Sequence, residues 1–303
     1  MFKHILVPLD GSGMAEAALP AAVFFAAKFK AVVTLFHVVE RNAPREIHGQ
    51  PHLKDAGEAA DYLKAVAQRA FPAGARVDFH VHTTEVDNVA ESIVAHADEL
   101  HHDMIVMCSH GRGKALHLLL GSIAQKVIAK GRLPVLITHP GRDGGVPAFS
   151  CSQLLLPLDG DPEHEKALPV AKELAKGCGA VLHLVMVVPS FGSLSGESAV
   201  ASRFLPGTMA KILEMSVPQA EEYLRAQAET LRGQGIKARA HVLRGDPAAA
   251  LDEFSRQLQA DLIIMATHGT SGMNALWEGS VAHKVISRSS VPLLLIRVEK
   301  SKA

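Results

Sequence analysis

His110-Gly111, nine residues and then Gly121-Ser122 form a stretch that occurs a second time in the chain, as His268-Gly269, nine residues and Gly279-Ser280. Each copy follows a short apolar run and leads into a segment with helical spacing, which ends at a proline and another apolar run. The order strand, glycine-bounded loop, helix, strand points the amides of a helix N-terminus at a phosphate group. The stretch therefore predicts an α/β fold with two phosphate-binding loops.

The first predicted strand is repeated as well. Ile5-Leu6-Val7-Pro8-Leu9-Asp10-Gly11 matches Leu154-Leu155-Leu156-Pro157-Leu158-Asp159-Gly160, 149 residues later. At the His-Gly motifs the offset is 158 residues, so the second copy holds extra residues, which we place in 190–218. Self-similarity over this length indicates a tandem duplication.

Apolar runs alternate with helical patterns in both copies. Such runs, when they are apolar throughout, indicate parallel sheets covered by helices on both faces. We therefore expect two α/β domains, at 1–143 and 153–303, joined by a linker at 144–152 that is rich in Gly and Pro. The predicted strands are residues 4–8, 32–38, 77–82, 104–107 and 135–138 in the first copy, and 153–157, 181–187, 238–242, 262–265 and 293–298 in the second.

The composition is that of a globular protein, with 48% hydrophobic and 20% charged residues among 303. Lys plus Arg and Asp plus Glu each total 31, so no net charge favours nucleic acid or an anionic membrane. The three cysteines form no C-x-x-C pattern, and no apolar stretch is long enough to span a membrane. We expect a cytoplasmic protein that binds neither nucleic acid nor membranes.

The repeated residues fall where parallel α/β sheets bind ligands, beyond the carboxyl ends of the strands. Gly111 and Gly269 follow a strand, and a missing Cβ lets the backbone approach a ligand. Gly121-Ser122 and Gly279-Ser280 open a helix and offer free amides and a hydroxyl. Asp10 and Asp159, which end the two first strands, are placed to meet a ribose, an adenine or a metal held by phosphates.

These residues resemble the universal stress protein family in its tandem two-domain form, over essentially the whole chain. ATP-binding members carry Gly, two residues, Gly, nine residues, and Gly followed by Ser or Thr. Here Gly111 and Gly121, then Gly269 and Gly279, match the second and third glycines, while Cys108 and Ala266 stand in place of the first. The resemblance implies flavodoxin-like domains of the adenine nucleotide alpha hydrolase type, each with a five-stranded parallel sheet.

The same resemblance implies an adenine nucleotide ligand, ATP above all, with Mg²⁺ bound only through the nucleotide at Asp10 or Asp159. Val38 and Val187 match the residue after strand two whose backbone meets adenine. The final strands, 134–138 and 292–298, would pair across a pseudo-twofold axis, which makes an intrachain pseudo-dimer, with a homodimer as a further prospect. The protein partner is not indicated.

The two loops differ in charge. Arg112 and Lys114 lie inside the first and are suited to neutralise phosphates, whereas the second, 270–278, has no cation and ends in Glu278. His110 and His268 are interpreted as residues that orient the glycine loops, because no nucleophile recurs beside them.

Several alternatives stay open at this level. Gly11-Ser12-Gly13 after a strand is a weak match to a dinucleotide turn, with Glu40 as the ribose acid. The many histidines are spread over different predicted elements, which favours surface positions over a zinc site. The amphipathic segment 191–219 is interpreted as a helix packed on its own domain, with a lid or a docking segment as alternatives. The leading hypothesis is a non-enzymatic nucleotide-binding stress or regulatory module; a slow ATPase, an adenylate-transferring enzyme and a nucleotide-free scaffold are the alternatives.

Overall fold

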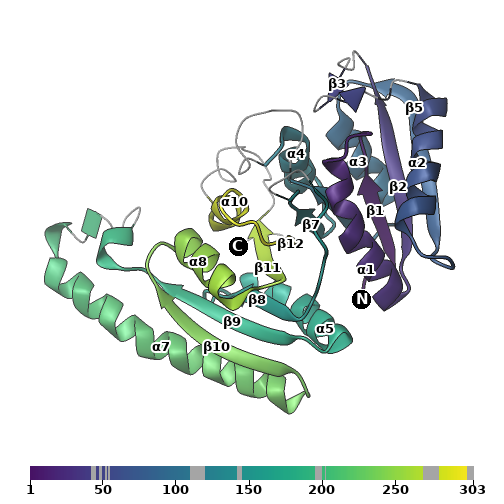
Figure 1. The fold of residues 1–303 in the computed structure, drawn as a ribbon. Helices are drawn as coiled ribbons and strands as arrows, with labels where there is room; N and C mark the ends of the chain where they lie inside the picture. Colours follow the sequence, from purple (N-terminus) through teal and green to yellow (C-terminus); the bar gives the residue numbers. More distant parts are fainter. Residues whose placement is uncertain are drawn as a thin grey trace. The chain divides into compact units, whose positions relative to one another are not determined.

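The computed structural model describes residues 1–41, 46–47, 50–51, 53, 55–109, 120–141, 145–194, 200–201, 203–268 and 280–298. The chain forms two compact units (Figure 1). Unit 1 holds Met1–Ser150 together with the C-terminal segment that begins at Pro292, and unit 2 holds Cys151–Thr267 with the segment that ends at Val291. The last predicted strand thus groups with unit 1, although the sequence division places it in the second repeat.

The strands of the first repeat form a five-stranded parallel sheet in unit 1. Successive strands are added to one side of β1 and then to the other, so the strand order reverses at β1. The strands lie in the order β5-β2-β1-β6-β7, and every neighbouring pair among them is parallel. The strands are β1 (His4–Pro8), β2 (Val32–Glu40), β5 (Val77–Val86), β6 (Met104–Cys108) and β7 (Val135–Thr138); β3 (Glu46–Ile47) and β4 (Gln50–Pro51) form a separate short hairpin.

Helices cover the sheet of unit 1 because each has an apolar face and a defined start. The helix α2 (Ala56–Ala70) begins at Asp55, whose carboxylate accepts hydrogen bonds from the Gly57 and Glu58 amides. It contacts α1 (Leu19–Phe29), whereas α3 (Val89–Glu99) contacts α4 (Ser122–Lys130), so the helices form two packed pairs. The short 3₁₀ helix η1 (Ala15–Ala18) leads into α1. The strands β6 and β7 are wholly buried, and β1 and β2 are buried over most of their length, as predicted from their apolar composition. The edge strand β5 contains no buried residue.

Unit 2 repeats this plan. Its sheet has the order β10-β9-β8-β11, again with parallel neighbours. Asp246 is the N-cap of α8 and Pro247 its first helical residue. The elements are β8 (Gln153–Pro157), η2 (His164–Ala167), α5 (Leu168–Cys178), β9 (Val181–Val188), η3 (Phe191–Ser193), α7 (Pro206–Gly233), β10 (Lys237–Arg244), α8 (Pro247–Leu258), β11 (Leu262–His268) and α10 (Val281–Ile286). The predicted flavodoxin-like α/β class is confirmed.

The final strand, β12 (Leu293–Val298), pairs antiparallel with β7. Leu294 faces Leu136, and these two residues occupy the same position in the two repeats. Because residues at the same position of the two repeats face each other, the pairing of β7 with β12 has local twofold symmetry. This agrees with the expectation that the final strands of the two repeats pair. Arg297 on β12 donates to the carbonyl oxygens of Ala129, at 2.9 Å, and Gly131.

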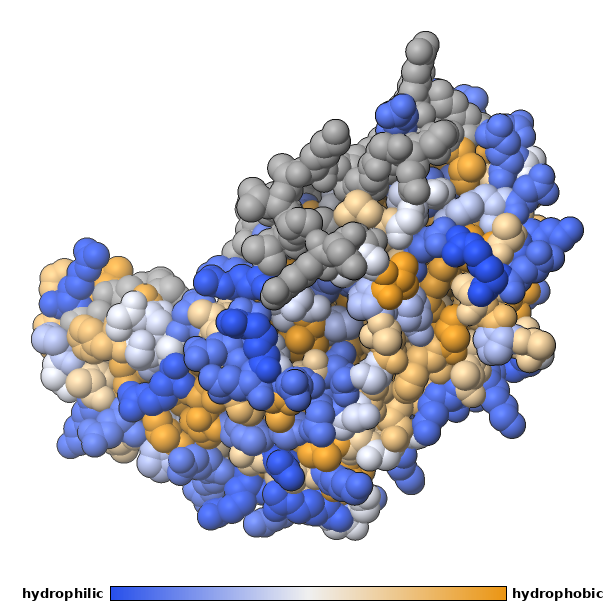
Figure 2. Space-filling view, in the orientation of Figure 1, coloured by the Kyte–Doolittle hydropathy of each residue, from blue (hydrophilic) through white to orange (hydrophobic). Residues whose placement is uncertain are grey.

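The inserted segment of the second repeat contains the 28-residue helix α7, with Pro218 in its interior. The helix packs on β10 and β9, and four of its five buried residues follow Pro218. These four residues lie outside segment 191–219, so they do not bear out the packed-helix interpretation of that segment. Before Pro218, Leu213 is the one buried residue of α7. At and just before the start of α7, four large apolar side chains are exposed: Phe204, Leu205, Ile212 and Met215. Figure 2 shows hydrophobic surface over this part of the helix, at the left of the view. No helix among the described residues is long and apolar enough to cross a membrane.

Candidate functional site

The candidate site of unit 1 lies at the carboxyl ends of β1 and β6. These strands are neighbours, and the chain order of the sheet reverses between them. Asp10 lies two residues beyond β1, and Ser109 directly follows β6. In open α/β sheets ligands bind at such a reversal, because the loops that follow the two strands diverge and leave a crevice.

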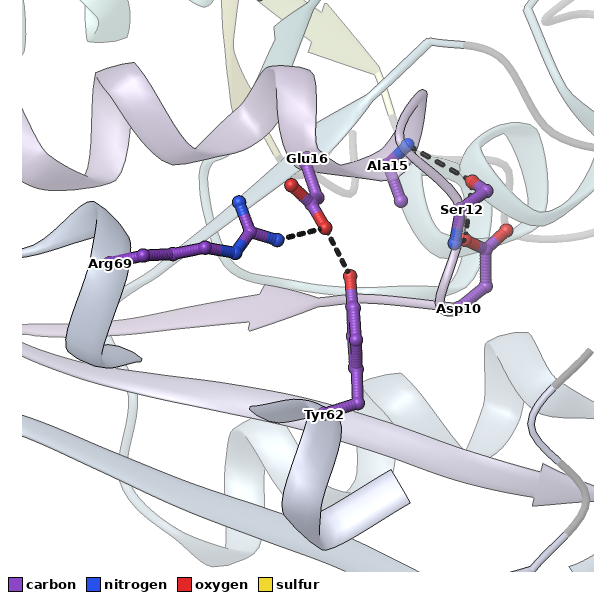
Figure 3. Close-up of polar contacts among 6 residues, drawn as sticks. All are labelled: Asp10, Ser12, Ala15, Glu16, Tyr62 and Arg69. Atoms are coloured by element: carbon purple, nitrogen blue, oxygen red, sulfur yellow. Dashed lines mark hydrogen bonds and ion pairs between the residues drawn. The ribbon is translucent and has the colours of Figure 1, made fainter. Parts of the chain in front are cut away.

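The turn after β1 holds the Asp10 carboxylate in place (Figure 3). Asp10 Oδ1 accepts hydrogen bonds from the Ser12 amide at 2.9 Å and the Ser12 hydroxyl at 2.6 Å. Ser12 Oγ in turn accepts from the Ala15 amide at 3.2 Å, which ties the turn to η1. Gly11 between them has φ +88°, a left-handed conformation that favours glycine. Within the described part of the chain, Asp10 Oδ2 has no hydrogen-bond partner, so this oxygen remains free to accept one.

A buried histidine supports the same turn from the neighbouring strand. His37 on β2 is 2% exposed, and its Nδ1 lies 2.8 Å from the Leu9 carbonyl oxygen. A carbonyl oxygen only accepts, so His37 Nδ1 carries the hydrogen. This bond fixes the backbone immediately before Asp10.

The start of α4 forms the other wall of the site. Gly121 is its N-cap in extended backbone, and the Gly121 amide donates to the Ser109 carbonyl oxygen at 2.6 Å. The helix therefore begins next to the end of β6. Ser122 is the first helical residue, and the amides of a first turn have no partner within their own helix. The predicted helix opening at Gly121-Ser122 thus lies at the expected edge of the sheet.

Val38 lies inside β2 and not after it, as does Val187 in β9. The sequence pattern ended each strand too early, because β2 stays paired with β5, and β9 with β10, beyond the ends of β1 and β8. The Phe36 carbonyl oxygen accepts from the Leu9 amide, so it points toward β1. Strand orientation has a period of two, so the main-chain groups of Val38 point the same way, into the space beyond β1.

The corresponding turn of unit 2 has different contacts. Asp159 Oδ1 accepts from the Asp161 amide at 3.0 Å, and Oδ2 lies 2.6 Å from His164 Nδ1. Ala15 occupies the position of His164 in the first repeat. Both oxygens of Asp159 are therefore engaged, and the sequence analysis did not anticipate this pair.

The two repeated serines also differ in role. Ser280 is the N-cap of α10, and its hydroxyl accepts from the His283 amide at 3.1 Å. Ser122 makes no such cap, since Gly121 holds that position in α4. The helix that follows Ser280 has only six residues. Unit 2 therefore offers a shorter helix whose serine hydroxyl is already in use.

Six of the predicted site residues lie outside the described residues: His110, Gly111, Arg112, Lys114, Gly269 and Gly279. His268 is the last residue of β11. Cys108 and Ala266, which replace the first motif glycine, lie in β6 and β11.

The sequence analysis missed a repeated contact beside each aspartate turn. Tyr62 on α2 donates to Glu16 at 3.0 Å, and Arg69 binds the same carboxylate oxygen at 2.5 Å (Figure 3). In unit 2, Tyr223 on α7 donates to Glu165 at 2.5 Å. Burial, followed by the neighbouring glutamate, raises the pKa of both tyrosine hydroxyls, so they remain donors. The signal was present, since these are the only two tyrosines of the chain.

The histidines do not form a metal site in the described part of the chain, where no group of three or more His, Cys, Asp or Glu side chains could hold an ion. His80, His82 and His96 do gather at β5 and α3, with ring centroids 5.3 Å apart for His80 and His96 and 4.7 Å for His82 and His96. Burial, and then the charge of His96, lowers the pKa of His80 and of His82. The three rings pack against one another as an aromatic cluster.

The comparisons with known proteins agree with this architecture. A universal stress protein of Mycolicibacterium smegmatis is 25% identical over 304 residues, which cover 97% of this chain and 96% of the relative. Another, from Methanocaldococcus jannaschii, is 28% identical over 152 residues, or 50% of this chain and 84% of that protein. A solved universal stress protein from Archaeoglobus fulgidus shares the fold with a TM-score of 0.66 at 20% identity, covering 98% of this chain and 97% of that one. The model of the universal stress protein family matches residues 1–139 and again 152–297, so the chain belongs to this family in its tandem form.

Proposed function

We propose that the protein binds an adenine nucleotide, ATP above all, at the site of unit 1. The observation that carries this proposal is that the Asp10 carboxylate and the N-terminus of α4 both lie at the edge of the sheet where the strand order reverses. Asp10 is held by Ser12 with one carboxylate oxygen left over, and α4 opens next to the end of β6. A ribose hydroxyl needs a hydrogen-bond acceptor, which Asp10 offers. A polyphosphate needs several hydrogen-bond donors, which the first turn of α4 offers.

Each part of the nucleotide has a candidate partner. The first-turn amides and hydroxyl of α4, at Gly121-Ser122, bind phosphate oxygens, and Arg112 and Lys114 neutralise their charge. The free oxygen of Asp10 accepts from the ribose. The main chain of Val38 meets the edge of adenine, as the resemblance implies.

Mg²⁺ would be held mainly by the phosphates. Asp10 is the one carboxylate of the proposed contact set, and no group of three acidic or histidine ligands stands among the described residues. One carboxylate and water leave an octahedral ion dependent on phosphate oxygens. No nucleophile recurs beside His110 and His268 in the sequence, and we propose a non-enzymatic regulatory module whose nucleotide state alters its association with itself or a partner.

Unit 2 is the weaker site in this proposal. Asp159 already binds His164, the helix after Ser280 is short, and the loop of this repeat lacks a cation. His268, Gly269, Gly279 and Val187 are the further contact residues that the resemblance implies for the second repeat. We expect nucleotide occupancy there to be lower than in unit 1.

The test is to denature purified protein and identify released nucleotide by mass spectrometry, and to measure thermal stabilisation by added ATP. We expect Gly121→Val to remove most of the nucleotide and Gly279→Val to remove little. Absence of both nucleotide and stabilisation in the native protein would refute the proposal. Steady ADP release that stops with Asp10→Ala would instead identify a slow ATPase.

A further inference from the structure

A hollow lies in unit 2, at the end of the sheet opposite to Asp159. Its volume is about 460 Å³, and it lies where α7 ends and β9 and β10 begin. Three apolar residues and three cations line it, and the lining includes no carboxylate. The apolar residues are Val181, Ile236 and Ala238, and the cations are Arg232, Lys237 and Arg239.

The three cations have few partners of their own. Arg232 Nε donates to the Ala238 carbonyl oxygen at 2.9 Å, which orients the guanidinium toward β10 and leaves its two terminal nitrogens for another acceptor. Among the residues that the structure describes, the side chains of Lys237 and Arg239 make neither a hydrogen bond nor an ion pair. The hollow therefore concentrates positive charge without a protein anion to balance it.

Two histidines beside the hollow experience this excess charge. His183 is completely buried on β9, directly opposite Arg239 on β10, and its Nδ1 lies 2.9 Å from His241 Nε2. Burial chiefly, then His241 and Arg239, lowers the pKa of His183 to about 4. Burial, and then Arg239, also lowers the pKa of His241. Only the Arg239 contribution, which is smaller than that of burial for both rings, comes from the cations of the hollow; a positive charge that disfavours protonation of an imidazole favours a bound anion.

The first repeat shows that the fold does not require a cation at the position of Arg239. His80 and His241 occupy the same register position, so Asp78 on β5 stands where Arg239 stands on β10. Arg76 stands in place of Lys237, and its guanidinium donates to the Lys30 carbonyl oxygen at 2.7 Å. Cations on an edge strand also discourage pairing with other chains. That role needs only exposed charge, whereas these side chains line a hollow together with apolar residues.

We propose that this hollow binds a small organic anion, in which a phosphate or carboxylate group contacts Arg232, Lys237 and Arg239 and an apolar body contacts Val181, Ile236 and Ala238. The hollow is open to solvent and its three cations are exposed, so its volume of about 460 Å³ suits a small molecule that stays partly in contact with water. Arginine is suited to both anionic groups because its planar donors match two oxygens at once. The site is separate from the nucleotide site and does not depend on it.

The test uses the full-length protein with phenyl phosphate and benzoate as probes, followed by the ring signals of His241 in NMR titrations. We expect saturable binding of at least one probe, a rise in the His241 pKa, and a loss of affinity of about tenfold or more when Lys237→Gln and Arg239→Gln are combined. Whichever probe binds more tightly identifies the anionic group. Inorganic phosphate alone should bind more weakly, because it lacks the apolar body.

Matched variants separate this site from other cationic surfaces. Lys211→Gln removes an exposed cation of the same helix, about 30 Å before Arg232 at 1.5 Å per residue, and should leave probe affinity unchanged. Gly121→Val, which disrupts the nucleotide site, should also leave it unchanged. Absence of any His241 response to either probe, equal weakening by Lys211→Gln, or equally tight binding of inorganic phosphate would overturn the proposal.

Discussion

The aspartate turns of the two units share one backbone plan but differ in what their carboxylates can still bind. Gly11 and Gly160 have nearly the same left-handed φ, +88° and +81°. In unit 1 one oxygen of Asp10 is used by Ser12, whereas in unit 2 His164 takes the second oxygen of Asp159. The residue at one repeated position therefore decides whether the second carboxylate oxygen already has a partner. With Ala15 in the first repeat Asp10 Oδ2 stays available, whereas His164 in the second repeat binds Asp159 Oδ2. In this chain a side-chain difference changes what the turn can bind while its backbone conformation is kept.

The largest expected difference concerns the two aspartates. We expect Asp10→Ala to weaken ATP binding roughly tenfold to hundredfold, the usual worth of a hydrogen bond to a charged group. Asp159→Ala should change the same affinity by less than about threefold, because Asp159 binds His164 instead. Isothermal titration with ATP measures both. Ser12→Ala is the control, because it loosens the turn but keeps the Asp10 carboxylate. Equal losses of ATP affinity in Asp10→Ala and Asp159→Ala would contradict the proposed difference between the two sites.

The next difference lies in the tyrosine contacts. Glu16→Ala should lower the free energy of unfolding by about 1–3 kcal/mol, because it leaves the half-buried Tyr62 hydroxyl without its acceptor and also removes the partner of Arg69. Glu165→Ala should cost less, about 0.5–1.5 kcal/mol, since Thr230 stands in place of Arg69 and donates to its own helix. Urea unfolding of the full chain measures both values. Adding Tyr62→Phe to Glu16→Ala should recover part of the loss, and no recovery would argue against an unsatisfied hydroxyl.

A smaller difference is expected at the two turn glycines. Gly160→Ala meets no atom within 4 Å and should cost only the left-handed backbone strain, about 1–2 kcal/mol. Gly11→Ala brings its methyl group to 2.8 Å from Leu53 Cγ and should cost about 1 kcal/mol more. Thermal unfolding measures the pair. The additional Leu53→Ala change should remove the excess in the Gly11 variant, and an excess that persists would mean that Leu53 is not its cause.

The smallest expected effect is a gain of function in unit 2. His164→Ala frees Asp159 Oδ2 and imitates Ala15, so we expect ATP affinity at this repeat to rise by about threefold, within the worth of one ordinary hydrogen bond. The measurement is a titration in the Gly121→Val background, where unit 1 no longer competes. An unchanged affinity there would show that the loop charge, and not His164, limits the second site.

Much of the fold follows from local pattern. Fully apolar runs predicted the central strands, and the repeated glycine-serine pairs predicted where α4 and α10 begin, because helix starts and buried strands depend on neighbouring residues. The ends of β2 and β9 were predicted too early. β2 ends in the polar residue Glu40, and β9 ends at Val188, directly before Pro189. Pairing with β5 and β10, which are distant in the chain, keeps these residues extended.

Sequence alone was enough to establish the duplication, the α/β class and the position of both aspartates, since each depends on local composition and on comparison of the chain with itself. The contacts of Asp159 with His164 and of Tyr62 with Glu16 required the folded chain. The hollow at Arg232 and Arg239 required it too, because its cations come from the end of a helix and from the strand that follows. Side-chain contacts of this kind depend on rotamers and on the packing of separate elements, which residue spacing does not specify.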